Sequence, residues 1–359
     1  MKTRMLFVLM SIAAVALFWH STGCKKNPVS PEPRNLSWSV DTLSHPDNWQ
    51  VSISDIWASS TKDVYAAGGA NTTHGILWHY NGTRWRDIKI SITEGGPIAG
   101  SIGFNDIYGF GSSDIFLAGD RFVRNSNPPP DYSHESLVVH YDGTEWHEIP
   151  SPPGNTLTSV WGSSPDNIWF GGIASTLFHY DGNQISAVAS PFSQSEERLA
   201  DYDIMSMSGH AERAYMLVRV RRTRYFLYEY GDKKAWQAVD STFSSFARGV
   251  WQSSWGPLYL LGDGTLRRES DQNTLLLDPF QTLRSYGIHG NRQDNLFVVG
   301  KASQEPYPGV LYHYNGQDWS IIHDMVRDNQ ALIEVWTDGR EVFIVARSEG
   351  TISMVYHGK

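Results

Sequence analysis

A single pattern recurs seven times along this 359-residue chain and constrains its fold more than any other feature of the sequence. In each copy an apolar or aromatic residue precedes a polar turn, and a second aromatic residue follows seven or eight positions later. The seven pairs are Trp57/Tyr65, Tyr108/Phe116, Trp161/Trp169, Met207/Tyr215, Trp251/Tyr259, His289/Phe297 and Trp336/Phe343. Their first members lie 51, 53, 46, 44, 38 and 47 residues apart. A period in this range, built from short β-type runs, indicates the blades of a β-propeller.

The second half of the repeat predicts hairpins. The segments Tyr80–Trp85, Tyr141–Trp146 and Tyr314–Trp319 share one spacing around an Asn-Gly or Asp-Gly pair. Such pairs between apolar runs favour type I′ turns, whose two central residues need φ > 0. Each repeat is therefore predicted to hold four short antiparallel strands. In the third repeat we place them at about 156–161, 167–173, 175–180 and 184–189.

The two ends of the repeat region predict how the ring closes. The last repeat stops at Lys359, after its third strand, whereas Leu36–Trp38 resembles the fourth strands of other repeats. We therefore predict an all-β fold over 36–359: a seven-bladed β-propeller whose last blade is completed by the N-terminal strand (3+1). Closure of this kind removes the exposed sheet edges that an open array would leave.

Residues 1–23 are predicted to be a lipoprotein signal peptide. Lys2 and Arg4 precede the apolar stretch Met5–Trp19, which is short for a membrane-spanning helix. The segment Ser21–Cys24 resembles a bacterial lipobox, in which the cysteine is lipid-modified and becomes the first mature residue. Cys24 is the only cysteine of the chain, so it cannot form an internal disulfide.

The predicted location follows from the residues after Cys24 and from the charge. Residues 24–35 form a polar, Pro-rich tether without an acidic retention signal, which favours the outer membrane of a Gram-negative bacterium. The formal net charge of −9 argues against a nucleic-acid partner, because nucleic-acid-binding surfaces are basic.

Strand order sorts the connections onto two faces. Loops between the second and third strands share one face with the connections between blades, and we call it the loop face. The other, the turn face, carries the short first-to-second and third-to-fourth turns. Insertions fall on the loop face, at 90–104, 120–135, 190–203, 301–309 and 323–331. Long loops on a rigid frame commonly carry binding residues, so we predict that the loop face binds the ligand.

Two kinds of side chain on these loops suit recognition. The arginine cluster at 219–224 offers guanidinium donors for carboxylates, or it is a solvated turn paired with nearby acids. Aromatic rings on the loops could stack on sugars or anchor a protein, or they fold over the core. The predicted binding residues are Trp49, Arg121, Arg124, Tyr132, Arg198, Tyr202, Arg221, Arg222 and Tyr307.

Catalytic and metal motifs do not emerge from the sequence. His79, His140, His179 and His313 each precede the tyrosine at the end of the third strand, but they belong to different blades, which favours structural hydrogen bonds over a metal array. No HExxH or GxSxG motif is present. We therefore predict no catalytic residue, metal or cofactor.

The repeats resemble those of secreted bacterial β-propellers related to the kelch and Asp-box families, most clearly at Val160–Trp169 and His140–Trp146. Sialidases carry Asp-boxes, so the resemblance implies a sialidase-like enzyme as an alternative. Such an enzyme needs three arginines, a tyrosine and acidic residues converging on the axis, and no residue here is assigned to that set. The favoured reading is a membrane-anchored module that binds an envelope protein or a glycan.

Replacing Cys24 by serine should abolish lipid attachment, because the cysteine sulfur is the atom to which the diacylglyceryl group is attached. We expect the wild-type chain expressed in a Gram-negative host to incorporate labelled palmitate and to partition into detergent. The Cys24→Ser chain should do neither. Continued labelling of the variant would contradict the assignment.

Overall fold

The computed structural model describes residues 33–45, 50–70, 75–124, 132–192, 198–231, 234–243, 247–270, 273–276, 280–322, 325–348 and 353–359. Cys24 and the signal segment lie outside these ranges. Within them, no helix has the length and apolar character needed to cross a membrane.

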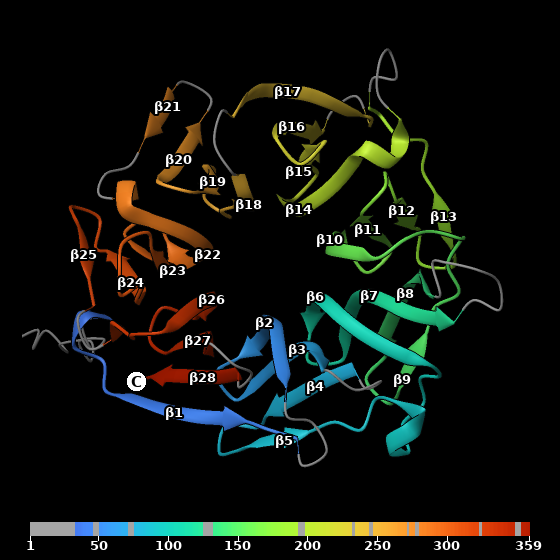
Figure 1. The fold of residues 1–359 in the computed structure, drawn as a ribbon, viewed down its shortest axis with the longest axis horizontal. Coiled ribbons are helices and arrows are strands. Elements are labelled where there is room, and N and C mark those ends of the chain that lie inside the picture. The colour runs from blue at the N-terminus through green and yellow to red at the C-terminus, as the bar shows by residue number, and fades with distance from the viewer. Residues whose placement is uncertain are drawn as a thin grey trace, which may run out of the picture.

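Seven four-stranded antiparallel sheets surround a central axis, which confirms the predicted all-β, seven-bladed propeller (Figure 1). Blades 1 and 2 consist of β2 (Val51–Ser60), β3 (Asp63–Ala70), β4 (Gly75–Tyr80), β5 (Trp85–Asp87), and β6 (Ser101–Gly111), β7 (Asp114–Arg124), β8 (Tyr132–Tyr141), β9 (Trp146–Glu148). Blades 3 and 4 consist of β10 (Leu157–Ser164), β11 (Asn167–Gly172), β12 (Leu177–Tyr180), β13 (Ile185–Ala187), and β14 (Tyr202–His210), β15 (Arg213–Val220), β16 (Arg224–Tyr230), β17 (Trp236–Phe243).

The remaining blades follow the same order. Blades 5 and 6 consist of β18 (Ala247–Gln252), β19 (Leu258–Gly262), β20 (Thr265–Ser270), β21 (Asn273–Leu276), and β22 (Leu283–Arg292), β23 (Asn295–Ala302), β24 (Gly309–Tyr314), β25 (Trp319–Ile321). Blade 7 consists of β26 (Gln330–Thr337), β27 (Val342–Ser348), β28 (Ser353–Gly358) and β1 (Trp38–Leu43). Short 3₁₀ helices lie before β1, β6, β14 and β22, at Pro33–Asn35, Ile92–Glu94, Leu199–Asp201 and Phe280–Thr282.

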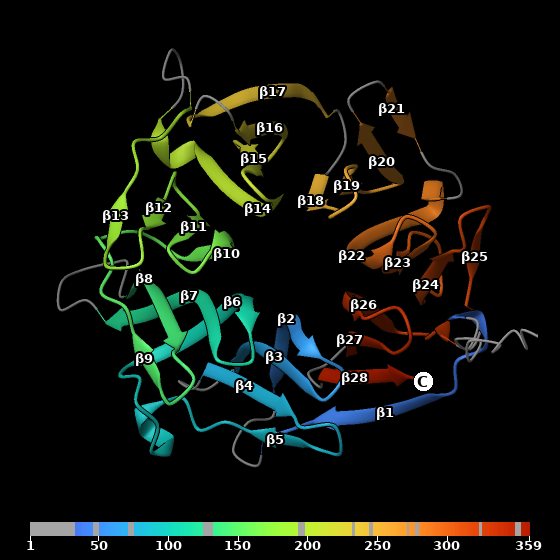
Figure 2. The same ribbon diagram turned by 180° about the vertical axis from the view of Figure 1, so that it is seen from behind.

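Strand β1 closes the ring as predicted. It runs antiparallel to β28, with Trp38 opposite Gly358 and Asp41 opposite Val355. Reciprocal backbone hydrogen bonds of 3.0 Å join Ser37 and Lys359 beyond the paired segment. Figures 1 and 2 show β1 along the outer edge of blade 7, beside the C-terminus.

The core consists of layers between neighbouring blades. The second strands are buried on both faces, and their aromatic residues Phe116, Phe297 and Phe343 are fully enclosed. Near the ends of two inner strands, the backbone of the following blade lies close to a large ring. A Cβ on Gly109 would lie 2.8 Å from Trp57, and one on Gly209 would lie 2.5 Å from Trp161. Glycine therefore permits these blades to approach each other.

The repeated histidines have the structural role favoured by the sequence. His79 and His140 contact Asp63 and Asp114 at 2.7 Å, and their rings stack on Tyr65 and Phe116. Two further repeats use asparagine as the partner, and blade 7 uses glutamate: His179–Asn167, His313–Asn295 and His357–Glu341. Each pair ties the third strand of a blade to its first-to-second turn.

Blade 4 departs from the repeat pattern, because Tyr215 lies opposite Ser208 and Met207 faces Met216. One sequence prediction, the turn type, is wrong. The Asn-Gly and Asp-Gly hairpins are four-residue loops and not type I′ turns, because only the glycine has positive φ, as at Gly143 (φ 92°). The Asp142 carboxylate takes over part of the turn by accepting the backbone N–H groups of residues 144 and 145 at 2.8 and 3.0 Å.

Cysteines placed at Thr42 and Met354 should form a disulfide in a Cys24→Ala background, because these residues are paired across β1 and β28. We expect oxidation to raise the melting temperature, since the bond would clamp the closing strand. Non-reducing electrophoresis and thermal melts measure both effects. Cysteines at Thr42 and Ser186, in blades 7 and 3, should not cross-link within one molecule. A failure of the 42/354 pair to oxidise would argue against the closure.

Candidate functional site

A β-bulge in every inner strand turns one side chain of each blade toward the axis. The register between the first and second strands shifts by one residue in all seven blades, as between Ile53 and Asp55 in blade 1. The extra residue changes which side chains face the channel. The residues directly after the bulge are Asp55, Asp106, Ser159, Ser206, Gly249, Gly287 and Glu334.

Four of these residues bind the backbone of the following blade. Asp55 Oδ2 accepts the N–H of Ile107 at 3.0 Å. Asp106 Oδ2 accepts the N–H of Val160 and the hydroxyl of Ser159, both at 2.8 Å. The Ser159 hydroxyl accepts the N–H of Met207 at 2.9 Å, and the Ser206 hydroxyl accepts that of Val250 at 3.3 Å. We call this set the axial relay, because each bond links one inner strand to the next.

Glycines interrupt the axial relay in blades 5 and 6. Glu334 uses the space over Gly287, where a Cβ would lie 2.5 Å from Glu334 Oε1. The Glu334 carboxylate accepts the N–H of Val335, in its own strand, at 3.0 Å. Glu334 therefore lies beside the axis, and no hydrogen bond among the described residues connects its side chain to another blade.

The inner strands enclose a cavity of about 480 Å³. In blade 4, Ser208 lies two residues after the bulge residue Ser206. In the other six blades an aromatic side chain occupies this position and lines the cavity: Trp57, Tyr108, Trp161, Trp251, His289 and Trp336. The lining continues to the exposed residues His210 and Ser254 and to Trp255, all at the turn-face ends of inner strands. The cavity therefore opens on the turn face, opposite the loop face on which the sequence placed the binding residues.

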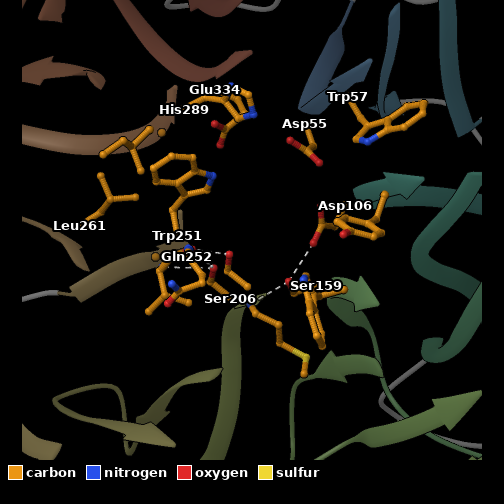
Figure 3. Close-up of a pocket in the computed structure, with 18 of the residues that line it drawn as sticks. Asp55, Trp57, Asp106, Ser159, Ser206, Trp251, Gln252, Leu261, His289 and Glu334 are labelled. Atoms are coloured by element: carbon orange, nitrogen blue, oxygen red, sulfur yellow. Dashed lines mark hydrogen bonds between the residues drawn. The ribbon is translucent and has the colours of Figure 1, made fainter. Parts of the chain in front are cut away.

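Three carboxyl groups from adjacent blades point into this cavity, as Figure 3 shows for Asp55, Asp106 and Glu334. Burial raises the pKa of Asp55 well above its usual value, and the neighbouring Asp106 carboxyl, with which it shares a hydrogen bond, raises it further. Burial also raises the pKa of Asp106, and it raises that of Glu334 to about 8. The carboxyl groups touch the channel but are surrounded by protein, so water solvates their charges poorly.

The other titratable groups of the cavity add little positive charge. Burial lowers the pKa of His289 to about 4, so this ring is neutral at pH 7. Arg248 is ion-paired with Asp263 at 2.5 Å and lies over the Tyr286 ring at 4.8 Å. The cavity therefore has carboxyl groups as its main titratable groups, between aromatic walls.

Several of the predicted binding residues are engaged within the loop face. Arg121 binds the carbonyl of Ala99 at 2.9 Å and the Glu148 carboxylate at 3.1 Å. Arg221 lies 3.3 Å from Asp201. Tyr202 is buried and stacks on Phe192, so it takes the alternative of an aromatic ring folded over the core. These contacts also show second-to-third loops meeting blade connections on one face.

The rest of the predicted set remains more accessible. Arg124 and Tyr132 lie opposite each other on β7 and β8, and Tyr132 is 56% exposed. Tyr307 is 39% exposed, with the Lys301 ammonium 5.7 Å from its ring centre. Arg198 and Arg222 are exposed, and Trp49 lies outside the described residues. Their role in binding stays a prediction.

One group of side chains has the composition of a metal site. His45, Asp87 and Glu94 bring their ligand atoms within 4.8 Å of one another. The Lys89 ammonium contacts Asp87 directly and lies 3.4 Å from both Glu94 Oε1 and His45 Nε2. The Lys89 ammonium supplies a positive charge to these carboxylates, so the contacts form an ion-pair network.

The sequence contains a signal for the channel that the repeat pattern alone does not reveal. Asp-Ile-Trp57, Asp-Ile-Tyr108 and Glu-Val-Trp336 place an acid two residues before the first aromatic of the repeat. In a strand these two residues share a face. An acid and an aromatic on the innermost strand could therefore have indicated a polar channel, although serine or glycine replaces the acid in the other four blades.

Comparison with known proteins supports the fold. No family model and no curated protein matches this chain. The structure of YCF48 bound to D1 peptide is 13% identical, with a TM-score of 0.62 over 89% of this chain and 94% of that one. The structure of YCF48 from Cyanidioschyzon merolae is 11% identical, with a TM-score of 0.60 over 89% of this chain and 98% of that one.

A third similar structure is the WD40 β-propeller domain of Doa1, at 10% identity and a TM-score of 0.56 over 90% of this chain and 97% of that one. Identities this low show a shared fold alone. The chain is thus a seven-bladed β-propeller, and the kelch or Asp-box character of its repeats stays a prediction.

The raised pKa of Glu334 predicts how stability depends on pH. The folded chain holds this proton more tightly than the unfolded chain, so its contribution to stability declines as pH rises from about 4.5 toward 8. Glu334→Gln should remove a decline on the order of 2 kcal/mol between pH 5 and pH 8. Denaturant unfolding at each pH measures it. The exposed Glu145→Gln is the control, and an unchanged slope in Glu334→Gln would contradict the assignment.

Proposed function

We propose that this protein is a binding module of the bacterial cell envelope, tethered to the outer membrane through lipidated Cys24, and that it holds a segment of a partner protein in its central channel. The observation that carries the proposal is the aromatic-walled cavity of about 480 Å³ on the axis of the closed ring. Cavities of this size accept one or a few side chains.

The walls are suited to anchor a partner. Trp57, Trp251 and Trp336 are only partly buried, so each presents part of its ring to the cavity. Tryptophan in a desolvated pocket is among the residues that contribute most to protein association. The axial relay holds these inner strands in place before a partner arrives, which limits the ordering cost of binding.

The comparisons favour a protein segment over a glycan as the ligand. One of the similar propellers was solved with a bound peptide. The sialidase-like alternative would place three arginines on the axis, whereas among described residues the cavity lining includes Arg248 alone, and Arg248 is paired with Asp263. A glycan ligand is retained as an outcome of the binding experiment.

A second surface belongs to the loop face. The β7–β8 ribbon turns Phe122, Arg124, Tyr132 and His134 to one side as two adjacent cross-strand pairs. Phe122 is 44% and Tyr132 56% exposed, and the Phe122 and His134 rings lie 4.4 Å apart. Exposed aromatic residues commonly anchor protein partners, so this ribbon is a second candidate surface for a partner.

A photo-crosslinking amino acid at position 255, at the channel mouth, should capture the partner in intact cells. Adding Trp251→Ala should weaken capture roughly 30-fold, the effect of losing about 2 kcal/mol from an aromatic anchor. Mass spectrometry of the adduct identifies the partner, and a thermal melt checks that the variant folds.

Crosslinkers at Tyr132 and at the exposed edge residue Ser186 are the matched controls. Capture from position 132 alone would assign binding to the loop face and contradict the channel. A carbohydrate adduct at position 255 would show that the channel binds a glycan.

A further inference from the structure

The cavity is chemically divided between two sides. Its three carboxyl groups come from the consecutive blades 7, 1 and 2, whereas blades 5 and 6 have glycine at the equivalent positions. In Figure 3 the carboxyl groups of Asp55 and Asp106 lie across the channel from Trp251 and Leu261, and the Glu334 carboxyl group lies between Asp55 and Trp251. A ligand that fits both sides has a positive end and an apolar stem.

The glycine side leaves room for that stem. A Cβ on Gly249 would lie 3.4 Å from Leu261 Cδ1 and 3.6 Å from Ser206 Oγ, which is ordinary contact distance. A methyl-sized group therefore fits over Gly249 without displacing its neighbours. Trp251 and Leu261 line the cavity next to this position, so apolar atoms of a ligand would find apolar surface there.

We propose that the channel binds a primary ammonium group on an aliphatic stem, presented as a lysine side chain of a partner protein, with the ammonium among Asp55, Asp106 and Glu334 and the stem against Trp251. This inference rests on the proposed function and names the chemistry of its ligand.

The geometry of the acceptors favours ammonium over guanidinium. An ammonium group has three donors that diverge, and the three carboxyl groups come from three blades around it. A guanidinium is a flat fork that is best matched by one carboxylate. The aromatic walls also attract an organic cation, because the faces of tryptophan rings carry negative potential.

The charge of the site matches one positive charge. Glu334 is largely protonated at neutral pH, and Asp55 and Asp106 share a hydrogen bond that requires one proton. These three carboxyl groups thus carry about one net negative charge together. The positive charge of Arg248 is balanced by Asp263, His289 is neutral, and His210 lies at the mouth. Tyr108 is neutral as well, since burial raises its pKa to about 12.

The affinity of the mature full-length chain for Nα-acetyl-lysine methylamide tests the inference, measured by calorimetry and by tryptophan fluorescence. We expect binding that Asp55→Asn and Glu334→Gln each weaken at least tenfold, with Glu145→Gln as the matched surface control. Affinity should rise severalfold from pH 6 to pH 8.5, with protons released on binding. Butylamine, which lacks the two amide groups and so buries less surface against the aromatic walls, should bind at least threefold more weakly.

Other outcomes overturn the inference in distinguishable ways. Equal binding of Nα-acetyl-norleucine methylamide would show that the charge is irrelevant, and tighter binding of the arginine analogue would assign the site to guanidinium. Failure of every probe, together with crosslinking of a partner at position 255 that Trp251→Ala abolishes, would reject the ammonium and leave the channel as the binding site. Failure of every probe and absence of a crosslinked partner at position 255 would reject the proposed function as well. Butylamine binding as tightly as the lysine derivative would favour a free amine over a partner's lysine.

Discussion

The inner strands can surround an open channel because hydrogen bonds between neighbouring blades hold them at a fixed distance from the axis. A propeller has no helix or plug at its centre, so its innermost side chains must satisfy one another or water. The axial relay does this with carboxylates and hydroxyls that accept backbone N–H groups of the next blade, from Asp55 through Ser206. Because each such acceptor is mostly removed from water, losing one would leave a buried donor unsatisfied. The same polar ring that joins the blades therefore gives the cavity its chemical character.

The blade count, the strand order and the 3+1 closure could be predicted because they depend on a repeated pattern. Each blade contains the same aromatic pair and hairpin, and periodicity makes each weak local signal stronger. Blade 4 departs from this pattern, because Ser208 occupies the position that an aromatic residue holds in the other blades and Met207 stands beside it. The turn type was wrong because the side chain of Asp142 provides hydrogen bonds that a residue-pair rule does not include.

The candidate site could not be predicted to the same extent. Asp55, Asp106 and Glu334 are up to 279 residues apart in the sequence and meet only because the ring closes. Loop length did not indicate this cavity. On the loop face, polar residues such as Arg121 and Arg221 bind the connections between blades. The cavity belongs instead to the regular part of the fold, where the turns are short and the sequence gives no length signal.

The point at which β1 joins the disc has a consequence for orientation. Ser37 is hydrogen-bonded to Lys359, and the end of β28 lies beside Val342, next to the first-to-second turn of blade 7. The chain upstream therefore leaves from the side on which the cavity opens. From Pro33 back to Cys24, even an extended chain spans only roughly 30 Å. If Cys24 carries lipid, as proposed, the mouth of the disc would stay within about a protein diameter of the bilayer.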